Sequence, residues 1–222
     1  MLRVPARVGL WNHHGRIATS TLHAMGSFAA LHLRARDMDG LVGPIDQWLG
    51  SHGFGAVERL DSAPSSLESF ATSANTVGLG RSNEEWCILR FNGFNLGGRF
   101  LDEDAVRPMA ERLACRVVLF TAQTTSSVYQ LVVFDGGTRV RRIVLSDGQV
   151  LHDDGERLPG ERAGAFAQSD AEDEADDDPP SEMEDLTEIG SAMGFELWPS
   201  PPIRGAVHVW RRGGLLSRLL GR

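Results

Sequence analysis

The chain contains no lysine: all 22 of its basic residues are arginine. This bias is typical of a GC-rich bacterial genome. Every positive charge is therefore a planar guanidinium, which suits paired hydrogen bonds to carboxylates and phosphates. Most of these arginines are expected on the solvated surface.

Cysteine is nearly absent too, with only Cys87 and Cys115 in 222 residues. Two thiols at no metal-ligand spacing build neither a disulfide framework nor a metal site, which indicates a reducing compartment. No stretch approaches the roughly 18 apolar residues that span a bilayer, and the first 30 residues lack the apolar core of a secretory signal. The sequence therefore predicts a cytoplasmic protein.

The usual catalytic signatures are also missing: there is no G-x-S-x-G, P-loop, Rossmann glycine pattern or H-E-x-x-H. Both cysteines fall in or beside apolar runs, so we expect them to be buried and inert. Four histidines crowd the first 32 residues, at spacings that match no known zinc pattern: His13, His14, His23 and His32. Asp102, Glu103 and Asp104 read most simply as the negative start of a helix. We expect no cofactor and no metal.

What the sequence has in excess is segregated charge. Residues 1–169 carry 17 arginines and 18 acidic residues, 170–196 carry 12 acidic residues and no basic one, and 203–222 carry five arginines and no acid. Such a dense acidic run repels itself, and Pro179 and Pro180 break any helix there. We predict an acidic disordered linker over 164–181. A calcium loop is an alternative, although the central glycine and the spaced ligands of such loops are missing.

Before the linker, the hydrophobic pattern predicts one α+β domain over 1–163, with a mostly antiparallel sheet and helices on one face. Residues 28–36 alternate as a strand with one wet face carrying His32, Arg34 and Arg36. Apolar residues at helical spacing predict two helices. The apolar stripe of the first consists of Leu41, Ile45, Trp48 and Leu49, and that of the second consists of Val106, Met109, Ala110 and Leu113. The Ser/Gly-rich residues 61–83 suggest a long surface loop.

A three-stranded meander is predicted at 128–153, because Gly136–Gly137 and Asp147–Gly148 are hairpin turn residues. Its middle strand carries Arg139, Arg141 and Arg142. Strict alternation places Arg139 and Arg141 on one face and Arg142 on the other. These arginines either protect an exposed edge strand from aggregation or bind an acidic partner or a phosphate.

A short pattern occurs twice: a strand, then D-x-D, then a proline with a leucine five residues later, then a strand. The first copy contains Asp37, Asp39, Pro44 and Leu49, and the second contains Asp102, Asp104, Pro108 and Leu113. Duplication and coincidence both explain so short a match. Pro108 is expected in the first turn of its helix, or at a kink.

After the linker, Met183, Leu186, Ile189 and Met193 predict a short amphipathic helix within 182–198. The remaining residues, 199–222, form a predicted basic tail. Its candidate partner-binding residues are Arg211, Arg212, Leu215 and Leu219. The tail either frays, packs on its own domain, enters a groove of a partner or contacts an anionic membrane, and the membrane is the less favoured choice. Nucleic-acid binding is disfavoured by the calculated pI of 5.3.

About half of the chain resembles uncharacterised bacterial small α+β proteins, some of them linked to immunity against polymorphic toxins. The resemblance rests on "WCILRFNG", "AVRPMAERLACRVVLF", the meander, the closing "GERLPGE" at 155–161 and "EMEDLTEIGSAMGFELW" at 182–198. It implies a partner-binding protein without chemistry of its own, and it identifies no site residue.

We therefore expect a non-enzymatic cytoplasmic interaction protein of the immunity-like kind that binds a protein partner. The alternative is a small-molecule or metal-dependent enzyme that uses His13, His14 and the Asp102–Asp104 region. The partner, any substrate and the oligomeric state are left open by the sequence.

Overall fold

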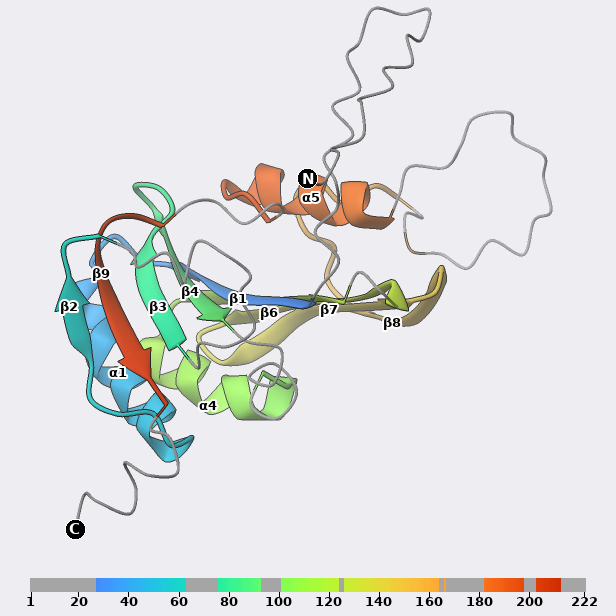
Figure 1. Ribbon diagram of the computed structural model, residues 1–222. Coiled ribbons are helices and arrows are strands. Elements are labelled where there is room, and N and C mark those ends of the chain that lie inside the picture. The colour runs from blue at the N-terminus through green and yellow to red at the C-terminus, as the bar shows by residue number, and fades with distance from the viewer. Residues whose placement is uncertain are drawn as a thin grey trace, which may run out of the picture.

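The computed structural model describes residues 27–62, 76–92, 101–123, 126–163, 166, 182–197 and 203–212. Within them lie nine strands and three helices (Figure 1). The helices are α1 (Asp39–Ser51), α4 (Glu103–Leu113) and α5 (Glu182–Met193). The strands are β1 (Ser27–Arg34), β2 (Glu58–Leu60), β3 (Thr76–Arg81), β4 (Trp86–Asn92), β5 (Arg116–Gln123), β6 (Val128–Asp135), β7 (Thr138–Ser146), β8 (Gln149–Gly155) and β9 (Arg204–Arg211).

All nine strands join one sheet in the order β2-β9-β3-β4-β1-β5-β6-β7-β8, and every neighbouring pair is antiparallel. The prediction of an α+β fold with an antiparallel sheet is confirmed. β1 lies at the centre of the sheet, and β2 and β8 form its two edges.

The middle of the sheet is a doubled split β-α-β arrangement. β1 and β3 are parallel to each other with β4 between them, and they are joined through α1. β4 and β5 are likewise parallel with β1 between them, and they are joined through α4. The first unit thus ends in β3, and residues 58–60, between α1 and β3, form the edge strand β2. That the two units arose by duplication stays a prediction.

The sheet separates two hydrophobic cores. On one face, α1 and α4 pack on Leu31, Leu89 and Leu119 of the central strands. On the other face, α5 packs on Ala30, Ile88 and Phe120 through Leu186 and Ile189. Figure 1 shows α1 and α4 below the sheet and α5 above it. The expectation of helices on one face thus describes α1 and α4, whereas α5 covers the opposite face.

The predicted apolar stripes become the buried faces of the helices. Leu41, Ile45, Trp48 and Leu49 are buried on α1, and Val106, Met109 and Ala110 are buried on α4. Asp102 caps α4, since its Oδ1 accepts a hydrogen bond from the Ala105 amide at 2.7 Å. Of the two expectations for Pro108, a place in the first turn is wrong: it lies at the sixth residue of α4, as Pro44 does in α1, and a kink at this position stays a prediction.

The meander and its turns are confirmed. Gly136, Gly137, Asp147 and Gly148 all have positive φ, as two-residue hairpin turns of this hand require. The predicted amphipathic helix is also present as α5, with Leu186 and Ile189 buried and Met183 and Met193 packed at the edge of the same core.

Two strands were missed by the sequence analysis. β3 lies within the predicted loop 61–83 and has only Val77 and Leu79 as apolar side chains. Its Gly80 is needed because a Cβ there would lie 2.0 Å from Cγ2 of Ile203. β9 lies within the predicted tail 199–222, yet it pairs with both β2 and β3.

The domain boundary after residue 163 therefore does not coincide with the end of the sheet. Trp210 of β9 is completely buried and donates from Nε1 to Asp46 of α1 at 2.8 Å. Of the predicted linker 164–181, only Phe166 is described, and it is buried in the α5-side core. The rest of that segment lies outside the described residues. None of the described helices is long and apolar enough to cross a membrane.

Candidate functional site

The arginines of the meander are divided between the two faces of the sheet. The pairing of β6 with β7 shifts register between Val133 and Phe134, so Val133 is opposite Arg141 and Phe134 is opposite Arg139. This irregularity interrupts the simple alternation along β7. Arg139 and Arg142 consequently face α4, and Arg141 faces the opposite core. The alternation expected from the sequence, with Arg139 beside Arg141, is wrong at this point.

Arg139 and Arg142 meet Arg107 of α4 around a single carboxylate. Nη1 of Arg139 lies 2.8 and 2.9 Å from the two oxygens of Glu103. Nη2 of Arg107 donates to Oε1 of Glu103 at 2.7 Å, and Nε of Arg142 lies 3.7 Å from Oε2. We call Arg107, Arg139 and Arg142 the arginine face. Glu103, whose side chain is 12% exposed, is its internal counter-ion.

Charge on this face is unequally matched. Burial would raise the pKa of Glu103, but hydrogen bonds from Arg139 and Arg107 outweigh it and lower that pKa below its usual value. Glu103 is therefore ionised at neutral pH, and one carboxylate serves three guanidinium groups. Asp104 adds a weaker contact, 3.6 Å from Arg107, with its own side chain 91% exposed. The Nε atoms of Arg107 and Arg142 are buried and have no hydrogen-bond acceptor among the described residues.

Arg141, in contrast, is part of the scaffold. Its side chain is 2% exposed and donates from Nε to Oε2 of Glu161 at 3.1 Å, while Nη2 also contacts Asp153. Glu161 in turn accepts a hydrogen bond from the Leu158 amide at 3.0 Å. A guanidinium so enclosed is not available to a partner.

The two described candidate residues of the tail, Arg211 and Arg212, lie far along the sheet from the meander. Arg211 ends β9 and forms an ion pair with Glu58 of β2. Arg212 is exposed, and its backbone forms an isolated antiparallel β-bridge with Phe54. Leu215 and Leu219 lie outside the described residues. The structure therefore does not bring the two predicted sets of arginines together, since β9 and β7 are six places apart in the strand order.

The acid–base and metal candidates have other roles where they are described. Asp102 caps α4 and Glu103 binds arginines. His13, His14 and His23 lie outside the described residues. Within the described ranges no group of three or more His, Cys, Asp or Glu side chains is placed to hold a metal ion. Burial raises the pKa of both thiols, that of Cys115 to about 11, which disfavours the thiolate. Cys87 is buried as expected, whereas Cys115 is only partly buried.

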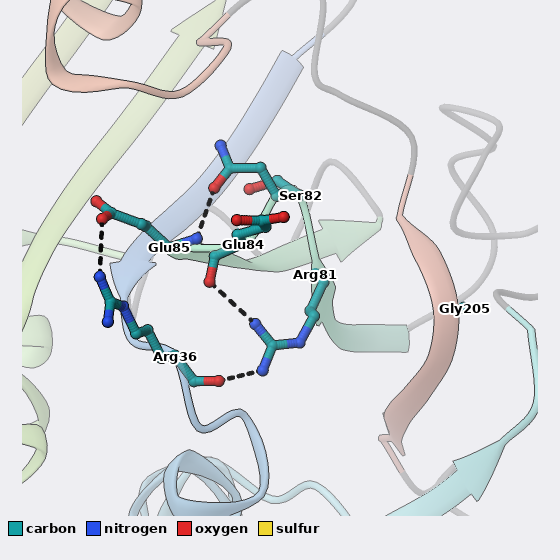
Figure 2. A pocket seen from close by; sticks show the side chains of 7 residues that line it. Arg36, Arg81, Ser82, Glu84, Glu85 and Gly205 are labelled. Atoms are coloured by element: carbon teal, nitrogen blue, oxygen red, sulfur yellow. Dashed lines mark hydrogen bonds and ion pairs between the residues drawn. The ribbon is translucent and has the colours of Figure 1, made fainter.

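An open cavity of about 740 Å³ lies at the turn between β3 and β4. Figure 2 shows Arg36 and Arg81 on its wall, with Arg81 reaching the carbonyls of Arg36 and Glu84. Glu85 pairs with Arg34 at 3.0 Å and Arg36 at 3.3 Å, and hydrogen bonds from these two arginines lower its pKa. Among the described residues, each charged group that lines this cavity thus has a partner in the same wall, apart from the exposed carboxylate of Glu84.

Comparison of the chain with protein-family models, with curated proteins and with solved structures gave no match. The case for a functional site therefore rests on the geometry.

Sequence reasoning identified Arg139 and Arg142 but missed Arg107 and Glu103 as members of the same cluster. A usable signal was present, because Glu103 and Arg107 are four residues apart on a predicted helix and so form a pair on one helix surface. What the sequence did not show is that β7 lies under the first turn of α4.

Proposed function

We propose that the chain is a protein-binding module without chemistry of its own, and that the arginine face recognises an acidic segment of a partner protein. The observation that carries this proposal is the convergence of Arg107, Arg139 and Arg142 on the one carboxylate of Glu103. Three guanidinium groups thus share one carboxylate, and they retain the capacity to bind a further carboxylate from a partner.

The chemistry of the three side chains favours a protein partner. Arginine is enriched at protein interfaces, and its planar fork pairs with carboxylates in defined geometry. The three side chains are 43%, 36% and 27% exposed, so each is held by the fold yet reachable from solvent. Ordered arginines lose less conformational entropy on binding than free surface arginines do.

The net charge of the chain, −8, makes a local positive site necessary for binding an acidic partner. A protein with this charge repels an acidic partner at long range, so binding of such a partner requires a local positive site. Binding at this site is expected to weaken as salt rises, since partly exposed charges are screened.

The immunity-like interpretation, in which the partner is a toxin, and the cytoplasmic location belong to the same proposal. The enzyme alternative would use His13 and His14, which lie outside the described residues, and no observation on the described residues favours it.

The test is a titration of the full-length protein with a fluorescent polyglutamate peptide of about twelve residues. The double variant Arg139→Gln/Arg142→Gln is expected to bind at least about tenfold more weakly than the wild type, the loss of roughly two charge-assisted contacts. The matched control is Arg36→Gln/Arg59→Gln, which removes two exposed arginines elsewhere, 84% and 61% exposed. Equal losses in both variants, or no binding by the wild type, would contradict the proposal.

A further inference from the structure

The segment that begins with β1 becomes exposed only where it reaches the cavity in Figure 2. Within β1, His32 is completely buried, which corrects the expectation of a wet face at this position. Neither of its ring nitrogens has a hydrogen-bond partner among the described residues, and the ring of Phe195 stacks on it. Arg34 and Arg36 are exposed as expected, with side chains 52% and 84% exposed. The polar part of this segment therefore lies at the cavity.

Two charged groups at this cavity have no ion-pair partner among the described residues. Arg34 and Arg36 share the carboxylate of Glu85, at 3.0 and 3.3 Å. The remaining charges of the cavity wall are the guanidinium of Arg81 and the carboxylate of Glu84. In Figure 2, dashed lines run from Arg81 to two backbone carbonyls, and none runs to the carboxylate of Glu84. A guanidinium and a carboxylate thus line one cavity without pairing with each other.

Arg81 is held in place by groups that do not neutralise its charge. Its Nη1 donates to the carbonyl of Glu84 at 3.4 Å, and its Nη2 donates to the carbonyl of Arg36. A carbonyl oxygen accepts a hydrogen bond but has no formal charge, and a guanidinium has more N–H donors than these two bonds use. The positive charge and the remaining donors of Arg81 are therefore available to an anionic group in the cavity.

The carboxylate of Glu84 belongs to a turn whose structure does not depend on it. Oδ1 of Asn83 accepts from the amides of Glu85 and Trp86 at 3.0 and 2.9 Å. Oγ of Ser82 donates to the carbonyl of Trp86 at 3.0 Å. These bonds hold the β3–β4 turn through its backbone and leave the carboxylate of Glu84 exposed. A group on such an ordered turn loses less conformational entropy on binding than one on a flexible loop does.

The cavity has room for a small molecule beside these two groups. Its volume of about 740 Å³ falls in the range of small-molecule pockets, roughly 300–1,000 Å³. Gly205 of β9 also lines it, and a Cβ at this residue would meet no atom within 4 Å. The glycine thus leaves its side of the cavity unfilled. A ligand lying between β9 and the β3–β4 turn would meet charges of both signs.

We propose that this cavity binds a small zwitterion, a molecule with an ammonium group at one end and a carboxylate at the other. The ammonium group binds the carboxylate of Glu84, and the carboxylate of the ligand binds the remaining N–H donors of Arg81. Both contacts are charge-assisted hydrogen bonds. A ligand with one charge would satisfy only one of the two groups. Free amino acids have this chemistry. The site is separate from the arginine face, since β4 and β7 are four places apart in the strand order.

The first test titrates the full-length protein with glycine, β-alanine and γ-aminobutyrate, which differ in the distance between their two charges. The backbone amide resonances of Glu84 and Gly205 report binding by NMR. We expect at least one of these zwitterions to shift both resonances to saturation. It should bind at least about tenfold more tightly than the amine and the carboxylate of the same chain length, because each of these lacks one charge-assisted contact. For γ-aminobutyrate these analogues are butylamine and butyrate.

The second test removes one charge of the cavity at a time. Glu84→Gln should bind the zwitterion at least about tenfold more weakly and the carboxylate analogue no more weakly than the wild type does, because only the ammonium contact is lost. Arg81→Gln should weaken binding of both ligands. Glu156→Gln is the matched control, since it neutralises an exposed carboxylate just after the edge strand β8, and it should bind like the wild type.

Three results would overturn the proposal: no zwitterion shifts the two resonances, a single-charge analogue binds as tightly as the zwitterion, or Glu84→Gln loses no more affinity than Glu156→Gln. Arg81→Gln removes a donor from two backbone carbonyls, so this variant alone is at risk of not folding. If it does not fold, the analogue series and Glu84→Gln decide the matter without it.

Discussion

Arg141 on β7 and Glu161 in the loop after β8 form an ion pair that is almost entirely withdrawn from solvent, with side chains 2% and 3% exposed. The next residue, Arg162, donates from Nε to Oδ1 of Asp185 in the first turn of α5 at 2.9 Å. Two consecutive residues of this loop thus bind the sheet on one side and α5 on the other. The segment "GERLPGE", singled out in the sequence, ends in this glutamate.

Removing one member of this pair should be costly, because it leaves a buried charge without its partner. We expect Arg141→Met alone to lower the free energy of unfolding by about 3–5 kcal/mol. Glu161→Leu alone should lower it by less, because Arg141 then keeps its contact with Asp153. The double variant Arg141→Met/Glu161→Leu should lose less than the sum of the two, since neither charge then remains unpaired. Urea unfolding measures all three, and additive losses would contradict the coupling.

Gly155 at the end of β8 is predicted to tolerate no side chain. It has φ of +99°, and a Cβ would lie 2.2 Å from the carbonyl oxygen of Val140. We expect Gly155→Ala to destabilise the protein by at least about 2 kcal/mol, through strain and the clash together. Gly148→Ala is the matched control, because Gly148 also has positive φ but no atom within 4 Å of the added Cβ. A control as damaging as Gly155→Ala would assign the effect to φ alone.

His32 should make stability depend on pH. The pKa of His32 is lowered in the folded state from 6.5 to about 3. Between these two pH values the imidazole is protonated in the unfolded chain but stays neutral in the folded protein. Stability is therefore lost as pH falls through this range, by about 1.4 kcal/mol per pH unit from this one group. Urea unfolding at several pH values measures the slope for the wild type and for His32→Leu.

The leucine variant should lack this contribution, so its stability relative to the wild type should grow steadily from pH 6 to pH 4.5. It should also be at least as stable as the wild type at neutral pH, because it removes two unpaired buried nitrogens. Parallel pH profiles for the two proteins would mean that His32 is hydrated or paired in solution.

The sequence predicted elements whose pattern is local and missed those defined by distant contacts. α1, α4 and the meander were found, because their apolar spacing and turn glycines are visible within about a dozen residues. β3 and β9 were missed because glycine occupies part of β3 and because their pairing joins residues more than a hundred positions apart. His32 alternates with leucines as an exposed residue would, and only the packing of α5 and Phe195 over it makes it buried.

The candidate site was predicted in part for the same reason. Arg139 and Arg142 were singled out as potential partner-binding residues, but the irregular pairing of β7 decides that they share a face and that Arg141 does not. No residue type in "TRVRRIVL" marks that irregularity. Arg107 joins them only because α4 crosses this part of the sheet.

The most direct test of the account is the effect of Glu103→Gln on binding of the polyglutamate peptide to the full-length protein. If Glu103 is the internal counter-ion of the arginine face, neutralising it leaves the guanidinium groups of that face free to bind carboxylates of a partner. The affinity should then rise several-fold, while the control Glu85→Gln, which neutralises the carboxylate paired with Arg34 and Arg36, leaves it unchanged. Unchanged or weaker binding by a folded Glu103→Gln variant would contradict the account.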